Sequence, residues 1–111
     1  MAGTFEITLS ESGKYRFNLL AGNGQVILTS QGYSDKKTAE NGIESVRKNS
    51  ADDGRFDRKV STSNQPYFSL TATNGQIIGT SQMYKGESSR DNGIDSVKTN
   101  APTAKIKDTT V

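Results

Sequence analysis

The chain contains an internal repeat. Residues 17–49 align with residues 68–100 at a constant offset of 51 positions and without a gap, and 17 of the 33 aligned residues are identical. Self-similarity at a fixed spacing indicates that one supersecondary unit occurs twice. Because one such unit is too small to bury its own apolar face, the two units are expected to cover each other.

The identical residues form three blocks that recur in the same order. The blocks are Asn-Gly-Gln at 23–25 and 74–76, Thr-Ser-Gln-x-Tyr at 29–33 and 80–84, and Asn-Gly-Ile-x-Ser-Val at 41–46 and 92–97. The spacing between the blocks is also the same in both copies. We therefore expect the same local structures twice.

Apolar and polar residues alternate in the first part of each copy, which is typical of half-buried strands. The alternation covers residues 4–9 and 15–21 in the first copy and residues 68–72 in the second. The Asn-Gly pair that follows predicts a tight two-residue hairpin with positive φ at both turn residues. A third strand is then expected at 25–30 and at 76–81.

A helix is predicted after the third strand of each copy. Ser34 or Asp35 is a suitable N-cap for a helix over 36–48, whose apolar residues form one narrow stripe that fits flat against a sheet. Glycine occupies equivalent positions inside both helices, as Gly42 and Gly93, although it costs about 1 kcal/mol relative to alanine there. We therefore predict that this turn closely approaches the sheet or the other helix.

A short strand follows each helix, at residues 55–61 and 104–108. The first of these both ends copy one and begins copy two, so about seven strands and two helices are expected. Consecutive hairpins favour one mainly antiparallel sheet with both helices packed on one face, which is an α+β fold. The length favours a single domain, 1–111, made of a first copy, 1–55, and a second copy, 56–111.

The three blocks, with Tyr15-Arg16-Phe17 before the first, resemble the YegP-like family of small bacterial proteins. The resemblance covers nearly the whole chain. It implies a β(3)-α-β unit present as a tandem repeat or as two subunits, with one shared sheet and exchanged last strands. It implies no activity. The chain departs from the pattern at Gly79, where the first copy has Leu28, and at Gly86 before the second helix.

The composition excludes several kinds of chemistry. The chain has no cysteine and no histidine, so disulfides, thiolate nucleophiles, cysteine-bound zinc and Ser-His-Asp catalysis are impossible. We expect no cofactor and no metal. No segment is apolar enough to cross a membrane, and the amino terminus does not resemble a signal peptide, so a cytoplasmic protein is expected.

The Thr-Ser-Gln-x-Tyr block is the best candidate for a binding site. It brings hydroxyls, an amide and a phenol to the end of a strand just before a helix N-terminus, where a small anionic or polar ligand is favoured. The alternative is structural: the hydroxyls belong to the strand and cap, and the tyrosines cover the core. The candidate residues are Thr29, Ser30, Gln31, Tyr33, Thr80, Ser81, Gln82 and Tyr84.

Asn41 and Asn92 extend this candidate site. They precede the two helical glycines at equivalent positions. Asparagine is unfavourable inside a helix, so its repetition predicts a buried side-chain hydrogen bond to a loop or strand edge. A ligand contact is the other interpretation.

The sequence offers two further candidate sites. Lys14, Arg16 and Arg58, with Tyr15 and Tyr67, would suit single-stranded nucleic acid if they shared one sheet face. The net charge of +2 gives this little support. The acidic pairs are Glu40 with Glu44, Asp52 with Asp53, and Asp91 with Asp95. Exposed pairs of this kind are usually solvated, and neither a base nor a nucleophile accompanies them.

The preferred interpretation is a non-catalytic module that binds a protein or a small polar ligand. It would act as a monomer that contains an internal pseudo-dimer. The alternatives are single-stranded nucleic-acid binding through the sheet face and, with less support, an enzyme that uses carboxylates or lysine.

Overall fold

A computed structural model describes residues 3–110. The elements are β1 (Thr4–Leu9), β2 (Tyr15–Leu20), β3 (Val26–Thr29), α1 (Lys36–Asn49), β4 (Phe56–Val60), β5 (Pro66–Thr71), β6 (Ile77–Thr80), α2 (Glu87–Asn100) and β7 (Lys105–Asp108). The predicted elements and their order are confirmed, with small differences at the boundaries. Within residues 3–110, neither helix has the length and apolar character that a membrane span requires.

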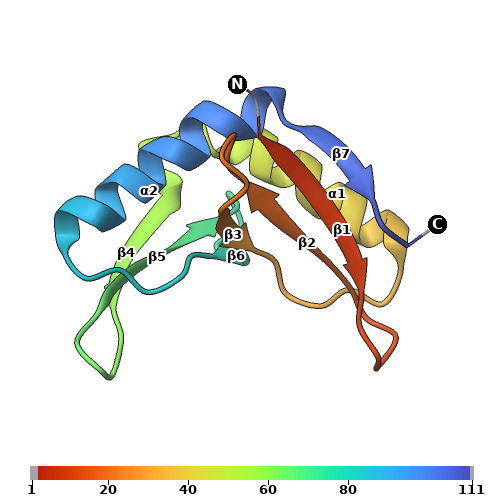
Figure 1. Ribbon diagram of the computed structural model, residues 1–111, viewed down its shortest axis with the longest axis horizontal. Coiled ribbons are helices and arrows are strands. Elements are labelled where there is room, and N and C mark those ends of the chain that lie inside the picture. The colour runs from red at the N-terminus through yellow and green to blue at the C-terminus, as the bar shows by residue number, and fades with distance from the viewer. Residues whose placement is uncertain (1–2, 111) are drawn as a thin grey trace.

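The strands form one sheet in the order β4-β5-β6-β3-β2-β1-β7. All neighbouring pairs are antiparallel except β1 and β7, which run parallel. The sheet bends into an arch, with α1 and α2 over its outer side and the end hairpins pointing away from the helices (Figure 1). Both helices therefore lie on one face, as predicted. We call the other face, on the inside of the arch, the concave face.

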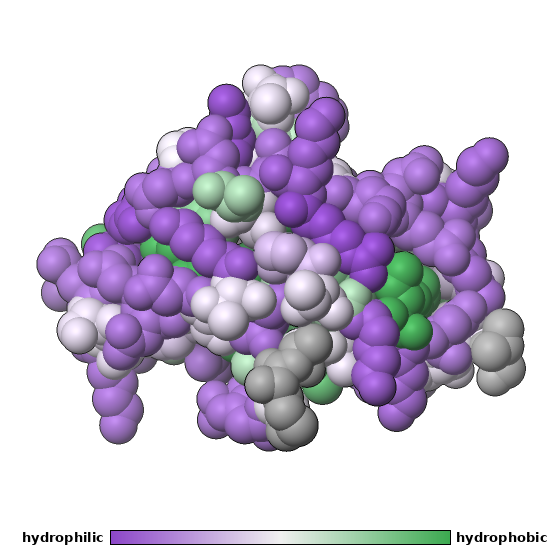
Figure 2. Space-filling model, turned by 90° about the horizontal axis from the view of Figure 1, so that it is seen from above, coloured by the Kyte–Doolittle hydropathy of each residue, from purple (hydrophilic) through white to green (hydrophobic). Residues whose placement is uncertain are grey.

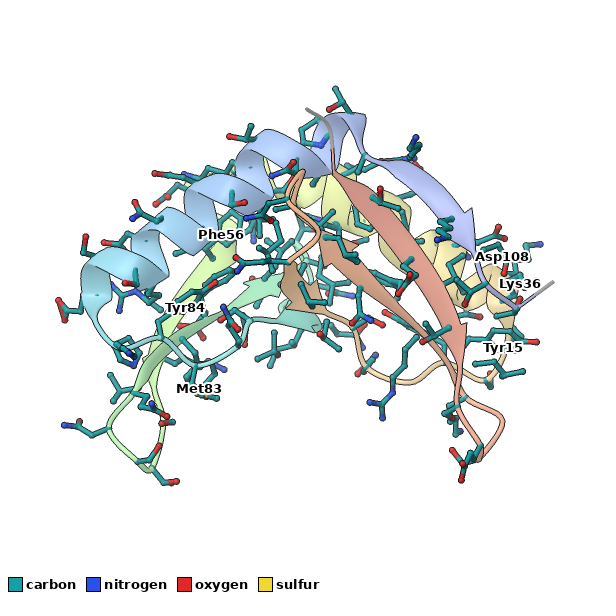
Figure 3. The ribbon with its side chains drawn as sticks, viewed as in Figure 1. Tyr15, Lys36, Phe56, Met83, Tyr84 and Asp108 are labelled. Carbon is teal, nitrogen blue, oxygen red and sulfur yellow. The ribbon has the colours of Figure 1, made fainter. Side chains whose placement is uncertain are left out.

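Each helix leads into a strand in the opposite half of the sheet. β4 follows α1 and pairs with β5, whereas β7 follows α2 and pairs with β1. Lys36 of α1 holds the end of β7 through an ion pair with Asp108 (2.7 Å; Figure 3). Lys36, helped by Thr110, lowers the pKa of Asp108 to about 2. The exchanged strands implied by the resemblance are confirmed.

The division into copies 1–55 and 56–111 stays a prediction, because β4 belongs to both. Residues 1–2 and 111, at the ends of those ranges, lie outside the described residues.

The buried residues form one cluster between the helices and the sheet, drawn from both copies. Phe5 packs edge-to-face on Phe17, and Phe56 on Phe68, with ring centroids 5.9 and 5.7 Å apart. α1 packs on β2 of its own copy and on β5 and β6 of the other. Seen from the helix side, the surface is mostly hydrophilic (Figure 2). The two copies therefore share one core, in which each helix packs on strands of its own copy and on strands of the other.

The hairpin between β2 and β3 differs from the predicted type. Only Gly24 of the Asn-Gly pair has a positive φ, 86°. The Ala21 carbonyl accepts the Gly24 N–H (2.9 Å), and the Ala21 N–H donates to the Gln25 carbonyl (2.8 Å), so the turn has three residues. Asn23 instead accepts the Gln25 N–H through its side chain (3.0 Å), which favours a right-handed conformation at this asparagine. The two-residue turn was the wrong prediction, and the second copy repeats the observed pattern.

The two helical glycines closely approach aromatic rings, as predicted. A Cβ on Gly42 would lie 2.8 Å from the Tyr33 hydroxyl and 2.9 Å from Cε2 of Phe17. Gly93 lies against Tyr84 and Phe68 in the same way. The sheet therefore requires glycine at this turn because a side chain would meet the rings beneath it.

Gly42→Ala is expected to lower the free energy of unfolding by up to about 2 kcal/mol. Overpacking costs about 1–3 kcal/mol, and better helix propensity offsets about 1 kcal/mol of it. Urea unfolding followed by circular dichroism measures the change. Asn41→Ala, one residue earlier and exposed, is the matched control and should raise stability slightly. A Gly42→Ala variant more stable than the parent would contradict the close approach.

Candidate functional site

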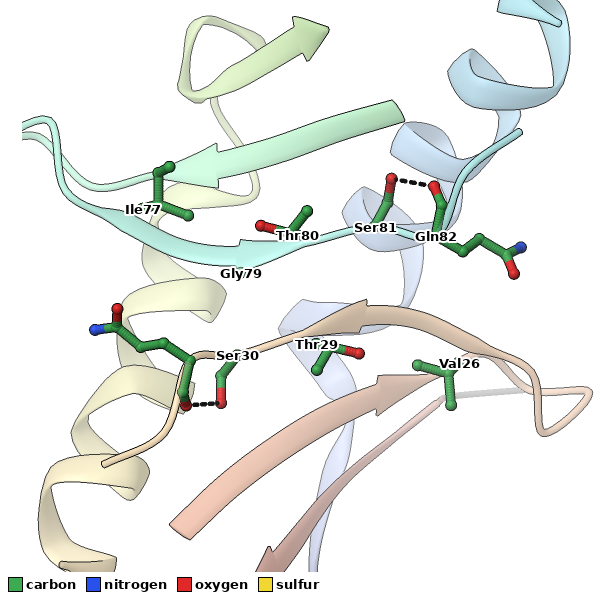
Figure 4. A pocket seen from close by; sticks show the side chains of 9 residues that line it. Val26, Thr29, Ser30, Ile77, Gly79, Thr80, Ser81 and Gln82 are labelled. Atoms are coloured by element: carbon green, nitrogen blue, oxygen red, sulfur yellow. Dashed lines mark hydrogen bonds between the residues drawn. The ribbon is translucent and has the colours of Figure 1, made fainter. Parts of the chain in front are cut away.

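The two copies of the Thr-Ser-Gln segment meet at the centre of the sheet. β3 and β6 are joined through one backbone pair, Thr29 with Thr80. Because these residues are equivalent in the two repeats, the pseudo-twofold axis that relates the copies passes between them. The predicted site segments from opposite halves of the sequence are thus brought side by side (Figure 4).

An open groove of about 380 Å³ lies at this junction. Leu28 and Gly79 flank the central pair and face the core, so the two threonine side chains point to the concave face. The lining consists of Gly79 and four equivalent pairs: Val26 and Ile77, Thr29 and Thr80, Ser30 and Ser81, Gln31 and Gln82. All of these residues are uncharged. We call this the central groove.

The groove combines hydroxyls and amides with two exposed apolar side chains. Val26 is 42% exposed and Ile77 is 43% exposed. Threonine hydroxyls donate and accept hydrogen bonds, and glutamine amides do both at separate atoms. This arrangement suits a small uncharged ligand with polar and apolar parts. Neither helix N-terminus lines the groove, and Asp35 already caps α1 by accepting the Thr38 N–H (2.7 Å), so the groove lining itself does not favour the predicted anion.

Val26 and Ile77 were not among the predicted site residues. They are equivalent residues, and each lies three positions before a site threonine. In a regular strand, residues three positions apart point to opposite faces of the sheet, so neither was expected in the groove. A register shift beside Leu20 in the first copy and beside Thr71 in the second changes that face. The one available signal was the apolar residue repeated at an offset of 51.

Ser30 and Ser81 have structural partners. The Ser30 hydroxyl accepts the Phe17 N–H (2.9 Å) and donates to the Gln31 carbonyl (2.8 Å). Ser81 makes the same two bonds, at 3.0 Å from the Phe68 N–H and 2.8 Å to the Gln82 carbonyl. Figure 4 draws the bonds from the two serines to the glutamine carbonyls. These hydroxyls continue the strand pairing where β3 and β6 end. The groups most available to a ligand are therefore the Thr29 hydroxyl and the glutamines, since the Thr80 hydroxyl lies 3.4 Å from the Ser69 hydroxyl.

Tyr33 and Tyr84 lie beneath the helices and do not line the groove. Tyr33 stacks on Phe17 and Tyr84 on Phe68, each with ring centroids 6.3 Å apart. Burial raises the pKa of both phenols, and the neighbouring glutamine side chains partly oppose this. The structural interpretation fits these two residues.

Asn41 and Asn92 are exposed, so the prediction of a buried hydrogen bond was wrong for them. They lie outside the central groove as well. The repeated buried asparagines are instead Asn49 and Asn100, whose side chains donate to the carbonyls of Ser45 and Ser96 (both 2.8 Å). The later pair lies eight residues further along the helix, about two turns on, and of the two pairs only the later one is buried.

The residues considered for nucleic acid lie on two different faces. Arg58 is on the helix side, bonded to Asp53 (3.2 Å), and Tyr15 packs against the core. Arg16 and Tyr67 point to the concave face by strand alternation, from opposite halves of the sheet. The basic and aromatic cluster that this hypothesis needs is not assembled.

Four of the six candidate acidic residues, Glu44, Asp52, Asp53 and Asp91, form surface ion pairs. Glu44 pairs with Arg47 (2.9 Å), and Asp91 pairs with Arg90 (3.0 Å). Lys98 and Arg58 lower the pKa of Asp53 through hydrogen bonds to its carboxylate. Within residues 3–110, no cluster of three or more acidic side chains is arranged to hold a metal ion.

Comparison with known families agrees with the repeat. A model of the family described as "Domain of unknown function (DUF1508)" matches residues 10–57 and again residues 61–108. A UPF0339 protein of Acinetobacter baylyi is 56% identical over 99% of both chains. The UPF0339 protein YegP of Escherichia coli is 49% identical over 99% of this chain and 100% of its own.

Two solved structures share the fold. The solution NMR structure of a UPF0339 protein from Shewanella oneidensis has a TM-score of 0.91 at 51% identity, covering 97% of this chain and 92% of that one. The solution NMR structure of YegP from E. coli has a TM-score of 0.93 at 49% identity, with coverage of 98% and 94%. These relatives are uncharacterised, and none indicates a catalytic role.

Proposed function

The chain belongs to the DUF1508 family, and we propose that it is a non-catalytic binding module that holds a small uncharged polar ligand in the central groove. The observation that supports this is the meeting of two Thr-Ser-Gln segments in one open groove. Its side chains offer hydrogen bonds without a titratable group, which suits binding better than acid–base chemistry. One chain supplies both halves of the groove, so a monomer suffices for binding.

Titration of the 15N-labelled chain, followed by amide NMR, tests the proposal. The probes are neutral amino acids, primary amides, monosaccharides and nucleosides, each as a separate series. At least one series should shift the amides of Thr29, Gln31, Thr80 and Gln82 together. If none of the four does so, the groove is not a site for uncharged polar ligands.

Thr29→Val and Thr80→Val, which keep the side-chain shape, are expected to weaken that binding about two- to tenfold each, since a hydrogen bond contributes about 0.5–1.5 kcal/mol. Thr8→Val on β1 is the matched control and should leave the affinity unchanged. A short single-stranded DNA at low salt is the comparison probe. If only DNA causes amide shifts, and these centre on Arg16 and Tyr67, the result supports the nucleic-acid alternative and contradicts the groove proposal.

A further inference from the structure

The sheet has a vacant strand position beside β4. β4 is the equivalent of β1, because Phe56 corresponds to Phe5 at the offset of 51. The outer edge of β1 is filled by β7, and beyond it the Thr109 N–H donates to the Ile7 carbonyl (3.1 Å). In the other half, the segment that follows α1 is β4 itself. Within residues 3–110, no strand therefore remains to pair with the outer edge of β4, and β4 ends the sheet.

Strand geometry identifies the backbone groups at this edge. The Ser61 N–H donates to the Gln65 carbonyl (2.9 Å) across the hairpin. Backbone groups alternate in direction along an antiparallel strand. The odd-numbered residues of β4 therefore point toward β5, and Arg58 and Val60 direct their N–H and C=O groups to the free edge. A row of such groups is a template for another strand.

The side chains of β4 are complementary to a second β4 in antiparallel orientation. The strand reads Phe-Asp-Arg-Lys-Val from residue 56 to residue 60. Centred on Arg58, antiparallel pairing sets Asp57 opposite Lys59 of the other copy, twice, on the concave face. On the helix side it sets Phe56 opposite Val60, which is 58% exposed here. Opposite charges and apolar pairs across strands are stabilising.

The central arginines of the two copies are already neutralised. Each Arg58 is within 3.2 Å of Asp53 and 3.5 Å of Asp91 in its own chain. The pairing offers four backbone hydrogen bonds: Arg58 N–H to the Arg58 carbonyl in both directions, and Val60 N–H to the Phe56 carbonyl in both directions. The Phe56 N–H is already bonded to the Asp53 carbonyl.

The opposite edge of the sheet lacks this complementarity. β7 carries Lys105 and Lys107 on the concave face, beside Thr4 and Glu6. A second β7, or a β4, placed antiparallel there would set lysine against lysine. Charges of one sign protect an edge strand from pairing. Only the β4 edge, with one charge of each sign, fits a copy of itself.

We propose that two copies of this chain pair reversibly through their β4 edges, with Arg58 on the dyad and the sheet continued across the contact. The pairing leaves both central grooves free. An edge contact of five residues per chain is small, so we expect a dissociation constant on the order of hundreds of micromolar.

Sedimentation velocity and amide NMR over a concentration series test the pairing. The full chain should show concentration-dependent shifts at residues 56–60 and a rising sedimentation coefficient. Asp57→Lys and Lys59→Asp should each weaken association at least fivefold, because like charges then face each other. An equimolar mixture of the two variants should restore it, since lysine again faces aspartate.

Glu6→Lys is the matched control. Glu6 is equivalent to Asp57 but lies beside β7 in the other half, so association should be unchanged. A full chain that stays monomeric throughout the series overturns the proposal. So does a mixture that associates no better than the single variants, because that result rules out this register.

Discussion

Leu28→Ala is expected to lower the free energy of unfolding by about 2–5 kcal/mol. Leu28 is fully buried. Its Cγ would lie 2.7 Å from a Cβ placed on Gly79, the equivalent residue of the other repeat. Two equivalent residues that touch lie on the pseudo-twofold axis, where there is room for one large side chain. Leu28 therefore fills space that belongs to both repeats.

Gly79→Ala is expected to cost about 1–3 kcal/mol, because the added methyl group overlaps Leu28. In the Leu28→Ala/Gly79→Ala variant, the new methyl enters the cavity left by leucine. The combined loss should therefore be smaller than the sum of the single losses by about 1–3 kcal/mol. Urea unfolding of the three variants measures this coupling.

Ile7→Ala combined with Gly79→Ala is the control. Ile7 is equally buried but lies on β1, three strands from β6 in the sheet order. Losses at separate sites are expected to add. If the Leu28 and Gly79 losses also add fully, one leucine does not serve both repeats.

Local features of the fold were predictable from the sequence. Alternation over residues 4–9 and the capping residue Asp35 are signals carried by neighbouring residues. Both strand and helix formed at the expected positions. The close approach at Gly42 was also predictable, because a glycine repeated inside a helix needs a steric reason.

Features that depend on distant residues were less accessible. The pairing of Thr29 with Thr80 joins segments about half the chain apart, and the register shift that turns Val26 onto the groove follows from strand pairing. Asn41 recurs in the second copy, and a buried hydrogen bond was predicted as the reason. That prediction was wrong, because the orientation of the helix on the sheet decides which asparagine is buried. Gly79 departs from the family pattern, and the sequence offers no reason for this. The reason is its position at the pseudo-twofold axis, where Leu28 fills the space.

Neither repeat is expected to fold alone, because the two share one sheet and one core and the groove lies between them. A fragment of residues 1–61 tests it most directly. The fragment keeps α1 but loses β5 and β6, on which α1 packs, and β7, the partner of β1. Two fragments would each bring Leu28 to the axis, so even a dimer would be strained.

Amide NMR and sedimentation of this fragment at low micromolar concentration are the decisive measurement. We predict no folded monomer: the spectrum should lack native dispersion, and any folded material should sediment as a dimer. A monomeric fragment with dispersed, native-like amide resonances would contradict the shared sheet and core.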